Sequence, residues 1–213
     1  MRVVIAGGHG QIALRLERLL AARGDEAVGI VRNPGHVADL EALGAQAVVL
    51  DLEKSDVDTV ADALKGADVA IFAAGAGAGS GDARKDTVDR GAAALFGEAS
   101  ERAGVRRHIQ VGSMGADNPD SPKYSPDFQV YLRAKKAAED DLKARDLDWT
   151  ILRPGALTDE PGTGLVLLAD KTGYGSVPRD DVAAALAVLL DAPASHRRTL
   201  ELISGDTPVA DAL

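Results

Sequence analysis

Short apolar runs alternate with longer amphipathic stretches along this chain. Val3 to Ala6 forms the first apolar run, and the stretch 11–23 follows it with apolar residues at helical spacing. Gly24 is a natural stop for that helix. Further strands are expected at about 27–31, 47–50, 69–73, 108–111, 149–152, 165–168 and 199–203, and further helices at about 34–44, 57–64, 86–103, 127–145 and 180–190.

Strands that alternate with helices of this length predict an α/β fold in which helices cover both faces of a parallel sheet. We expect a Rossmann-type, doubly wound sheet with the strand order 3-2-1-4-5-6 and right-handed crossovers. The sequence shows neither a further repeat nor a linker that would split the chain. The whole chain, 1–213, is therefore expected to be one NAD(P)-binding domain, with a small substrate lobe from about 153–178 and 196–213.

A glycine turn joins the first strand to the first helix. The pattern Gly7-x-x-Gly10-x-x-Ala13 in this place is typical of a dinucleotide-binding βαβ unit. Its glycines let the backbone approach a pyrophosphate, and the helix start offers that anion unpaired N–H groups. An ordinary strand–helix turn is the alternative interpretation. A second glycine-rich stretch, 75–81, is either a surface loop or part of the ligand-binding edge of the sheet.

The residue after the second strand indicates which dinucleotide is preferred. An acidic residue there would bond the ribose 2′-hydroxyl of NAD, but this strand ends in Arg32. A guanidinium suits a 2′-phosphate, so NADP(H) is expected to be preferred over NAD(H). A solvated arginine at a strand end is the alternative. Asp51, after the third strand, would accept a hydrogen bond from the adenine amino group, or would simply stabilise a turn.

Ser113, Tyr131 and Lys135 are the candidate catalytic residues. The spacing Tyr131-x-x-x-Lys135 puts a phenol and an ammonium one turn apart on the same helix face. The ammonium favours the phenolate form, which makes the phenol a better proton donor to a reduced carbonyl. Lys135 would also hold the nicotinamide ribose, and Ser113 would bond the substrate oxygen. A surface tyrosine beside a solvated lysine is the alternative.

Composition narrows the class of protein. The net charge of −9 argues against a general binder of nucleic acids or anionic membranes, so a small-molecule substrate is the expected partner. No apolar run approaches the length of about 18 residues that a membrane-spanning helix needs, and the early first strand leaves no room for a signal peptide. The chain has no cysteine and its four histidines lack ligand spacing, so no metal is expected. The cytoplasm is the expected location, and the oligomeric state stays open.

A set of motifs, spread over nearly the whole chain and in the family's order, resembles the short-chain dehydrogenase/reductase superfamily. The similarity is to its small atypical branch of NAD(P)H-binding, NmrA-like and biliverdin-reductase-B-like proteins. The motifs are Gly7-Gly-His-Gly-Gln-Ile-Ala13, Val31-Arg-Asn-Pro34, Ala73-Ala-Gly75, Gly112-Ser-Met-Gly-Ala-Asp117, Tyr131-x-x-x-Lys135, Trp149-Thr-Ile-Leu-Arg-Pro-Gly155, Thr158-Asp-Glu-Pro-Gly-Thr163 and Arg179-Asp-Asp-Val-Ala183. The chain departs from the pattern at His9, where threonine is usual, and at Ala13, where glycine is usual.

The resemblance implies which segments bind each part of the cofactor. It implies that the pyrophosphate is held by Gly7, Gly8, His9, Gly10, Gln11 and Ile12, and the 2′-phosphate by Arg32. The adenine would be flanked by Asp51 and Leu52, and the ribose would be lined by Ala73, Ala74 and Gly75. The nicotinamide would lie along Pro154, Gly155, Ala156 and Leu157. Some members of this branch reduce flavins, quinones or tetrapyrroles without a tyrosine acid, and others sense the cofactor without turnover.

Two functions therefore stay open. The first is an NADPH-dependent reductase that transfers hydride to a small carbonyl, quinone or flavin-like acceptor. The second is an NADP(H)-binding, redox-sensing regulatory protein without turnover. Because a sensor needs no proton donor, the pair Tyr131 and Lys135 favours the reductase.

Overall fold

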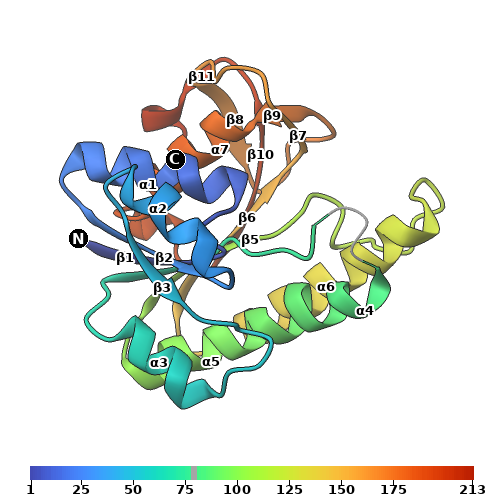
Figure 1. The fold of residues 1–213 in the computed structure, drawn as a ribbon. Coiled ribbons are helices and arrows are strands. Elements are labelled where there is room, and N and C mark those ends of the chain that lie inside the picture. The colour runs from blue at the N-terminus through green and yellow to red at the C-terminus, as the bar shows by residue number, and fades with distance from the viewer. Residues whose placement is uncertain (78–80) are drawn as a thin grey trace.

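The computed structural model describes residues 1–77 and 81–213, and one mixed sheet runs through them (Figure 1). Within the described part this sheet has nine strands, in the order β11-β8-β10-β6-β5-β4-β1-β2-β3. Their bounds are β1 (Arg2–Ala6), β2 (Glu26–Val31), β3 (Gln46–Val49), β4 (Val69–Phe72), β5 (Arg107–Val111), β6 (Asp148–Pro154), β8 (Leu165–Ala169), β10 (Arg198–Ser204) and β11 (Thr207–Pro208).

The predicted strand order is confirmed. The strands from β3 to β6 pair in parallel in the order 3-2-1-4-5-6. β10 extends the sheet in parallel beside β6, whereas β8 and β11 pair antiparallel at that edge. The sheet is therefore parallel at its centre and antiparallel at one edge only.

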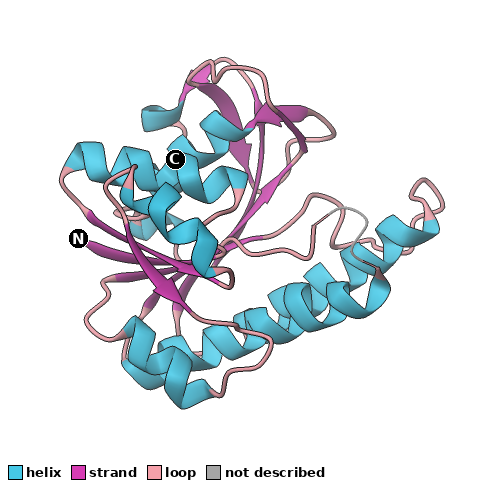
Figure 2. Ribbon diagram, viewed as in Figure 1, coloured by secondary structure: helices cyan, strands magenta, loops and turns pink. Residues whose placement is uncertain are grey.

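Helices cover both faces of the sheet (Figures 1 and 2). Their bounds are α1 (Gln11–Arg23), α2 (Val37–Glu41), α3 (Val57–Leu64), α4 (Asp82–Arg84), α5 (Ala93–Ala103), α6 (Pro126–Lys143) and α7 (Arg179–Leu189). Val3 and Ile5 of β1 belong to the core beneath α1, α2 and α7, while Val4 and Ala6 belong to the core beneath α3 and α5. Both sets are fully buried, which is why the central strands are continuously apolar.

Two predicted helices differ from the expectation. The stretch predicted as a helix at 34–44 begins as a 3₁₀ turn, η1 (Pro34–His36), and α2 already ends at Glu41. The helix expected at 86–103 starts earlier, at Asp82, and its part η2 (Lys85–Ala92) is π-helical. The wider π turn carries Val88, Asp89 and Ala92 to the buried side, an arrangement that apolar periodicity at 3.6 residues does not report.

The segments expected to form a small lobe lie side by side. β8 pairs with β10 and β11, and β7 (Ala156–Thr158) pairs with β9 (Ser176–Pro178) in a separate two-stranded sheet. Of the glycine-rich stretch 75–81, positions 78–80 lie outside the described residues. Within the described ranges, no helix combines the length and the hydrophobicity that crossing a bilayer requires.

Candidate functional site

The turn between β1 and α1 requires glycine for steric reasons. Gly7 has a left-handed backbone with φ of 82°, and a Cβ there would lie 2.7 Å from Cα of Ala74. A Cβ on Gly8 would lie 2.6 Å from Cα of Gly29. The N–H groups of Gly7 and Gly8 both donate to the carbonyl of Ile30, at 3.2 and 3.0 Å. The turn is thus held close to β2 and to the residues after β4, as only glycine permits.

The start of α1 fits the diphosphate of a dinucleotide. Gly10 occupies the N-cap position with an extended backbone, and among the described residues no side chain caps this helix. The first-turn N–H groups carry the partial positive charge of the helix dipole. Gly7 and Gly10 line the cavity, and a Cβ on either would crowd neighbouring backbone atoms. With glycine at both positions, the turn can bring its backbone close to an anion.

Two adjoining cavities open at the carboxyl ends of the parallel strands, where doubly wound sheets bind ligands. The smaller has a volume of about 360 Å³, and of the predicted residues it is lined by Gly7, His9, Gly10, Arg32, Asp51 and Leu52. The larger has a volume of about 930 Å³, and it is lined by Ile12, Ser113, Tyr131, Lys135, Pro154, Gly155 and Leu157. Ala73, Ala74 and Gly75 line both cavities, so the two form one continuous groove.

Three predicted residues line neither cavity. Gly8 is buried against β2, and Gln11 is exposed and holds Arg15 through its carbonyl and side-chain oxygens. Ala156 donates its N–H to the carbonyl of Gly175, 2.9 Å away, within the small sheet. The structure therefore gives these residues supporting positions beside the groove.

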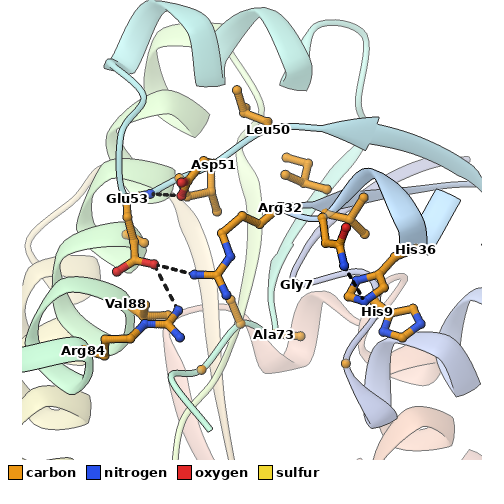
Figure 3. A pocket seen from close by; sticks show the side chains of 18 residues that line it. Gly7, His9, Arg32, His36, Leu50, Asp51, Glu53, Ala73, Arg84 and Val88 are labelled. Atoms are coloured by element: carbon orange, nitrogen blue, oxygen red, sulfur yellow. Dashed lines mark hydrogen bonds and ion pairs between the residues drawn. The ribbon is translucent and has the colours of Figure 1, made fainter. Parts of the chain in front are cut away.

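Arg32 points into the smaller cavity and meets a carboxylate there (Figure 3). Its Nη1 lies 3.1 Å from Oε2 of Glu53, and Nη2 of Arg84 lies 3.0 Å from the same oxygen. Thr87 donates its hydroxyl to the other oxygen of Glu53 at 2.7 Å. The hydrogen bond from Thr87, with those from the arginines, holds the pKa of Glu53 below its usual value. Arg32 is thus paired with a carboxylate although its side chain is 55% exposed, and its contact with a 2′-phosphate stays a prediction.

Asp51 stabilises a turn and also borders the smaller cavity. Its Oδ1 accepts from the backbone N–H of Glu53 at 3.1 Å, and its Oδ2 lies 3.4 Å from the ammonium of Lys54. The turn interpretation therefore holds, and the adenine contact stays a prediction. Nearby, the ring of His9 stacks on that of His36 at 3.6 Å between centroids.

Ser113, Tyr131 and Lys135 all line the larger cavity. Ser113 follows β5, and α6 carries the other two residues. The ammonium of Lys135 lies 5.7 Å from the centroid of the Tyr131 ring. Lys135 is only 4% exposed, which rules out the alternative of a solvated lysine.

A buried carboxylate holds Lys135 in place. Its Nζ lies 3.2 Å from Oδ1 of Asp89, on η2, and donates to the carbonyl of Val111 at 3.2 Å. The other carboxylate oxygen of Asp89 accepts from the N–H of Ala76. Burial alone would lower the pKa of Lys135, but its interactions with Tyr131 and Asp89 raise that pKa above its ordinary value. Lys135 is therefore charged at neutral pH.

An aromatic wall borders the larger cavity. Phe128 and Tyr131 both line it, and their rings stack with centroids 5.5 Å apart. Tyr124 packs edge-on against Phe128 at 5.3 Å, and its hydroxyl lies 2.6 Å from that of Tyr174. Through Tyr124, which precedes α6, these rings are linked to the segment between β8 and β9.

Sequence reasoning missed several residues of the groove. One of them, Glu53, follows β3. The others follow the glycine-rich stretch, and they are Asp82, Arg84, Lys85, Val88 and Asp89. Glu53 lies four residues after β3 and the others lie ten or more residues after β4, so no local pattern marks them as residues of the groove. Over 1–77 and 81–213, no group of three or more histidine, aspartate or glutamate side chains gathers as metal ligands would.

Comparison with known proteins agrees with this geometry. Residues 7–193 match the family described as NAD(P)H-binding. The uncharacterized sugar epimerase YhfK of Bacillus subtilis is 39% identical over 100% of this chain and 99% of its own length, and the yeast protein YMR090W of Saccharomyces cerevisiae is 32% identical over 98% and 96%.

Solved structures give the same picture. A Bacillus halodurans protein assigned to the NAD-dependent epimerase/dehydratases has a TM-score of 0.92 and 35% identity, covering 99% of this chain and 97% of its own. ChuY of Escherichia coli O157:H7, an anaerobilin reductase, has a TM-score of 0.80 and 28% identity, covering 97% and 98%. The glycine turn, the continuous groove and these similarities lead to one conclusion: the chain belongs to the NAD(P)H-binding family and has a Rossmann-type fold.

Proposed function

We propose that this protein is an NADPH-dependent oxidoreductase that reduces a small carbonyl, quinone or flavin-like acceptor. The observation that carries the proposal is that Ser113, Tyr131 and Lys135 line one cavity together with Pro154 and Leu157. That cavity continues into the one that Gly7 and Arg32 line. A proton donor and a dinucleotide groove therefore share one continuous space, as hydride transfer to a carbonyl requires.

The residues of the groove divide the cofactor between them. The turn at Gly7 and Gly10 would hold the diphosphate, Arg32 the 2′-phosphate, and Asp51 and Leu52 the adenine. Pro154, Gly155 and Leu157 would lie along the nicotinamide, with Ala156 supporting them from β7. When bound, the reduced nicotinamide supplies the hydride. NADP(H) is preferred in this proposal because Arg32 stands where an acidic residue would select NAD.

Tyr131 is the proposed proton donor. Negative charge develops on the acceptor oxygen as the hydride arrives, and a phenol positioned beside it can supply the proton. Lys135, held in its charged form against Asp89 and Val111, would stabilise the phenolate and bond the nicotinamide ribose. Ser113 would donate a hydrogen bond to the acceptor oxygen and orient it.

The acceptor class follows from the cavity walls. Phe128 and Tyr131 offer stacked rings on one side, and Leu157 offers an apolar contact. Flat surfaces of this kind suit a planar acceptor. Lys85 and Arg179 also line the cavity, as do Asp82, Asp89 and Asp127, so the lining gives no preference for the charge of the acceptor.

Steady-state kinetics of Tyr131→Phe tests the proposal. With a carbonyl acceptor, we expect kcat to fall by about 10²- to 10⁴-fold, because a general acid is lost. The affinity for NADPH, measured by direct titration, should hardly change. With a flavin or quinone acceptor, solvent can supply the proton and the loss should be small. Wild-type rates on a carbonyl substrate would remove Tyr131 from the mechanism.

Two other functions have some support. A redox sensor without turnover is favoured by the tight engagement of Lys135 with Asp89 and Val111, which is also how a purely structural lysine behaves. Epimerisation is favoured by the name of the Bacillus subtilis relative, a sugar epimerase. It is redox-neutral, so it would leave NADPH unconsumed, and a sensor would bind NADPH without oxidising it.

A further inference from the structure

Two guanidinium groups converge on one carboxylate in the smaller cavity (Figure 3). Arg32 follows β2 and Arg84 lies on α4, so the two come from different elements, and both contact the same Oε2 of Glu53. All three side chains line the cavity that also contains the glycine turn. A pair of cations is thus held together around a single acceptor atom.

The charges at this contact do not balance, because the other carboxylate of the cavity, Asp51, lies beside the ammonium of Lys54. Two guanidiniums carry two positive charges, and one carboxylate neutralises only one of them. A phosphate monoester carries about −1.5 to −2 charges at neutral pH and three strong acceptor oxygens. It can therefore satisfy both forks of donors, which a single shared oxygen of Glu53 cannot do.

Glu53 has a second partner that would retain it if the arginines turned away. Thr87 donates to Oε1, whereas the arginines contact Oε2. Loss of both arginine contacts would leave Glu53 with this hydrogen bond, on a side chain that is 21% exposed. The arginine side chains are more exposed, at 55% and 38%, so both can turn toward a ligand.

We propose that Arg84 is a second specificity-determining residue for the 2′-phosphate, and that Glu53 competes with that phosphate for both guanidiniums. The inference rests on the proposed preference for NADP(H). On this account Arg32 and Arg84 clasp the phosphate from two sides, and Glu53 lowers the affinity for it by pairing with them. The discrimination between NADP(H) and NAD(H) is then set by three side chains, of which only Arg32 follows β2.

Calorimetric titration with two fragments isolates this effect. Adenosine 2′,5′-bisphosphate and adenosine 5′-monophosphate differ only in the 2′-phosphate, and neither needs turnover or a nicotinamide. Arg84→Ala should weaken binding of the bisphosphate about tenfold or more, because charge-assisted hydrogen bonds are lost, and should leave the monophosphate unchanged. Glu53→Gln should strengthen the bisphosphate severalfold, again without an effect on the monophosphate.

Arg90→Ala is the matched control. Arg90 lies on η2, near Arg84 in sequence, but pairs with Asp86 and is not among the residues that line either cavity. It should change neither affinity. Equal effects of Arg84→Ala on both fragments, or weaker bisphosphate binding by Glu53→Gln, would overturn the inference. If the wild type prefers the bisphosphate and this preference needs Arg32 but not Arg84, the role of Arg84 is overturned while the proposed NADP preference stands. Equal wild-type binding of both fragments would overturn the proposed NADP preference itself.

Discussion

Glu17 lies on the buried side of α1, directly beneath the glycine turn. Its side chain is fully buried, and neither carboxyl oxygen has a hydrogen-bond partner among the described residues. A Cβ on Gly29 would lie 2.6 Å from Oε1 of Glu17, and one on Gly8 would lie 3.1 Å from it. Burial raises the pKa of Glu17 from 4.5 to about 8. The folded protein therefore keeps this carboxyl neutral at physiological pH.

Replacement of Glu17 by glutamine should change how stability depends on pH. Between pH 4.5 and about 8 the unfolded chain releases the proton while the folded chain retains it, so rising pH favours unfolding over this window. The wild type should lose about 3 kcal/mol between low pH and pH 7 through this group alone. Denaturant unfolding of Glu17→Gln should show this loss removed.

Glu98→Gln, an exposed change on α5, serves as the control for that measurement. It should follow the wild-type curve at every pH. Parallel curves for Glu17→Gln and the wild type between pH 5 and 8 would contradict the assignment of a neutral buried carboxyl.

Single residues differ in how well the sequence reports them. Arg32 could be predicted because its position after the second strand has a known meaning, and Tyr131 and Lys135 because helical spacing brings them together. Glu53 and Asp89 could not, since no local pattern says which carboxylates a fold will bring against those cations. Such contacts depend on tertiary structure, between segments far apart in the chain.

The turn between β1 and α1 offers a prediction for an element. Gly7 and Gly24 both have positive φ, of 82° and 79°, but a Cβ on Gly24 would meet nothing within 4 Å. Gly24→Ala should therefore cost only about 1 kcal/mol of backbone strain. Gly7→Ala adds an overlap with the backbone of Ala74, so it should cost clearly more and should also weaken NADP⁺ binding.

Denaturant unfolding and an NADP⁺ titration of the two variants make the comparison. Equal losses of stability in Gly7→Ala and Gly24→Ala, with unchanged NADP⁺ affinity in both, would show that close approach at Gly7 is not needed.

Element boundaries were predictable where stop and start signals are local. The helix predicted at 11–23 has those bounds as α1, and its C-terminal Gly24 adopts the left-handed backbone that a stop requires. The π-helical η2 was not predictable, because apolar periodicity at 3.6 residues does not report a π turn. The short β7, β9 and β11 were also missed, since strands of two or three residues carry too few positions for a pattern.

At the scale of the whole molecule, the lobe expected from 153–178 and 196–213 shares the central sheet. β10 pairs with β6 on one side and with β8 on the other. We therefore expect the chain to unfold as a single cooperative unit. Trp149, the only tryptophan, lies on β6, so its fluorescence reports on the junction between the two parts.

Fluorescence of Trp149 and far-ultraviolet circular dichroism should give coincident denaturation curves. A separate transition in circular dichroism, without a change in fluorescence, would show instead that part of the chain unfolds on its own.

The central claim is that this groove supports turnover. The most direct test monitors NADPH oxidation by the wild-type protein against a panel of quinones, flavins and aldehydes. The account predicts that at least one acceptor is reduced, and that NADPH supports the reaction better than NADH, because Arg32 favours the 2′-phosphate. Tight binding of NADPH without oxidation by any acceptor of the panel would contradict the reductase and favour the redox sensor.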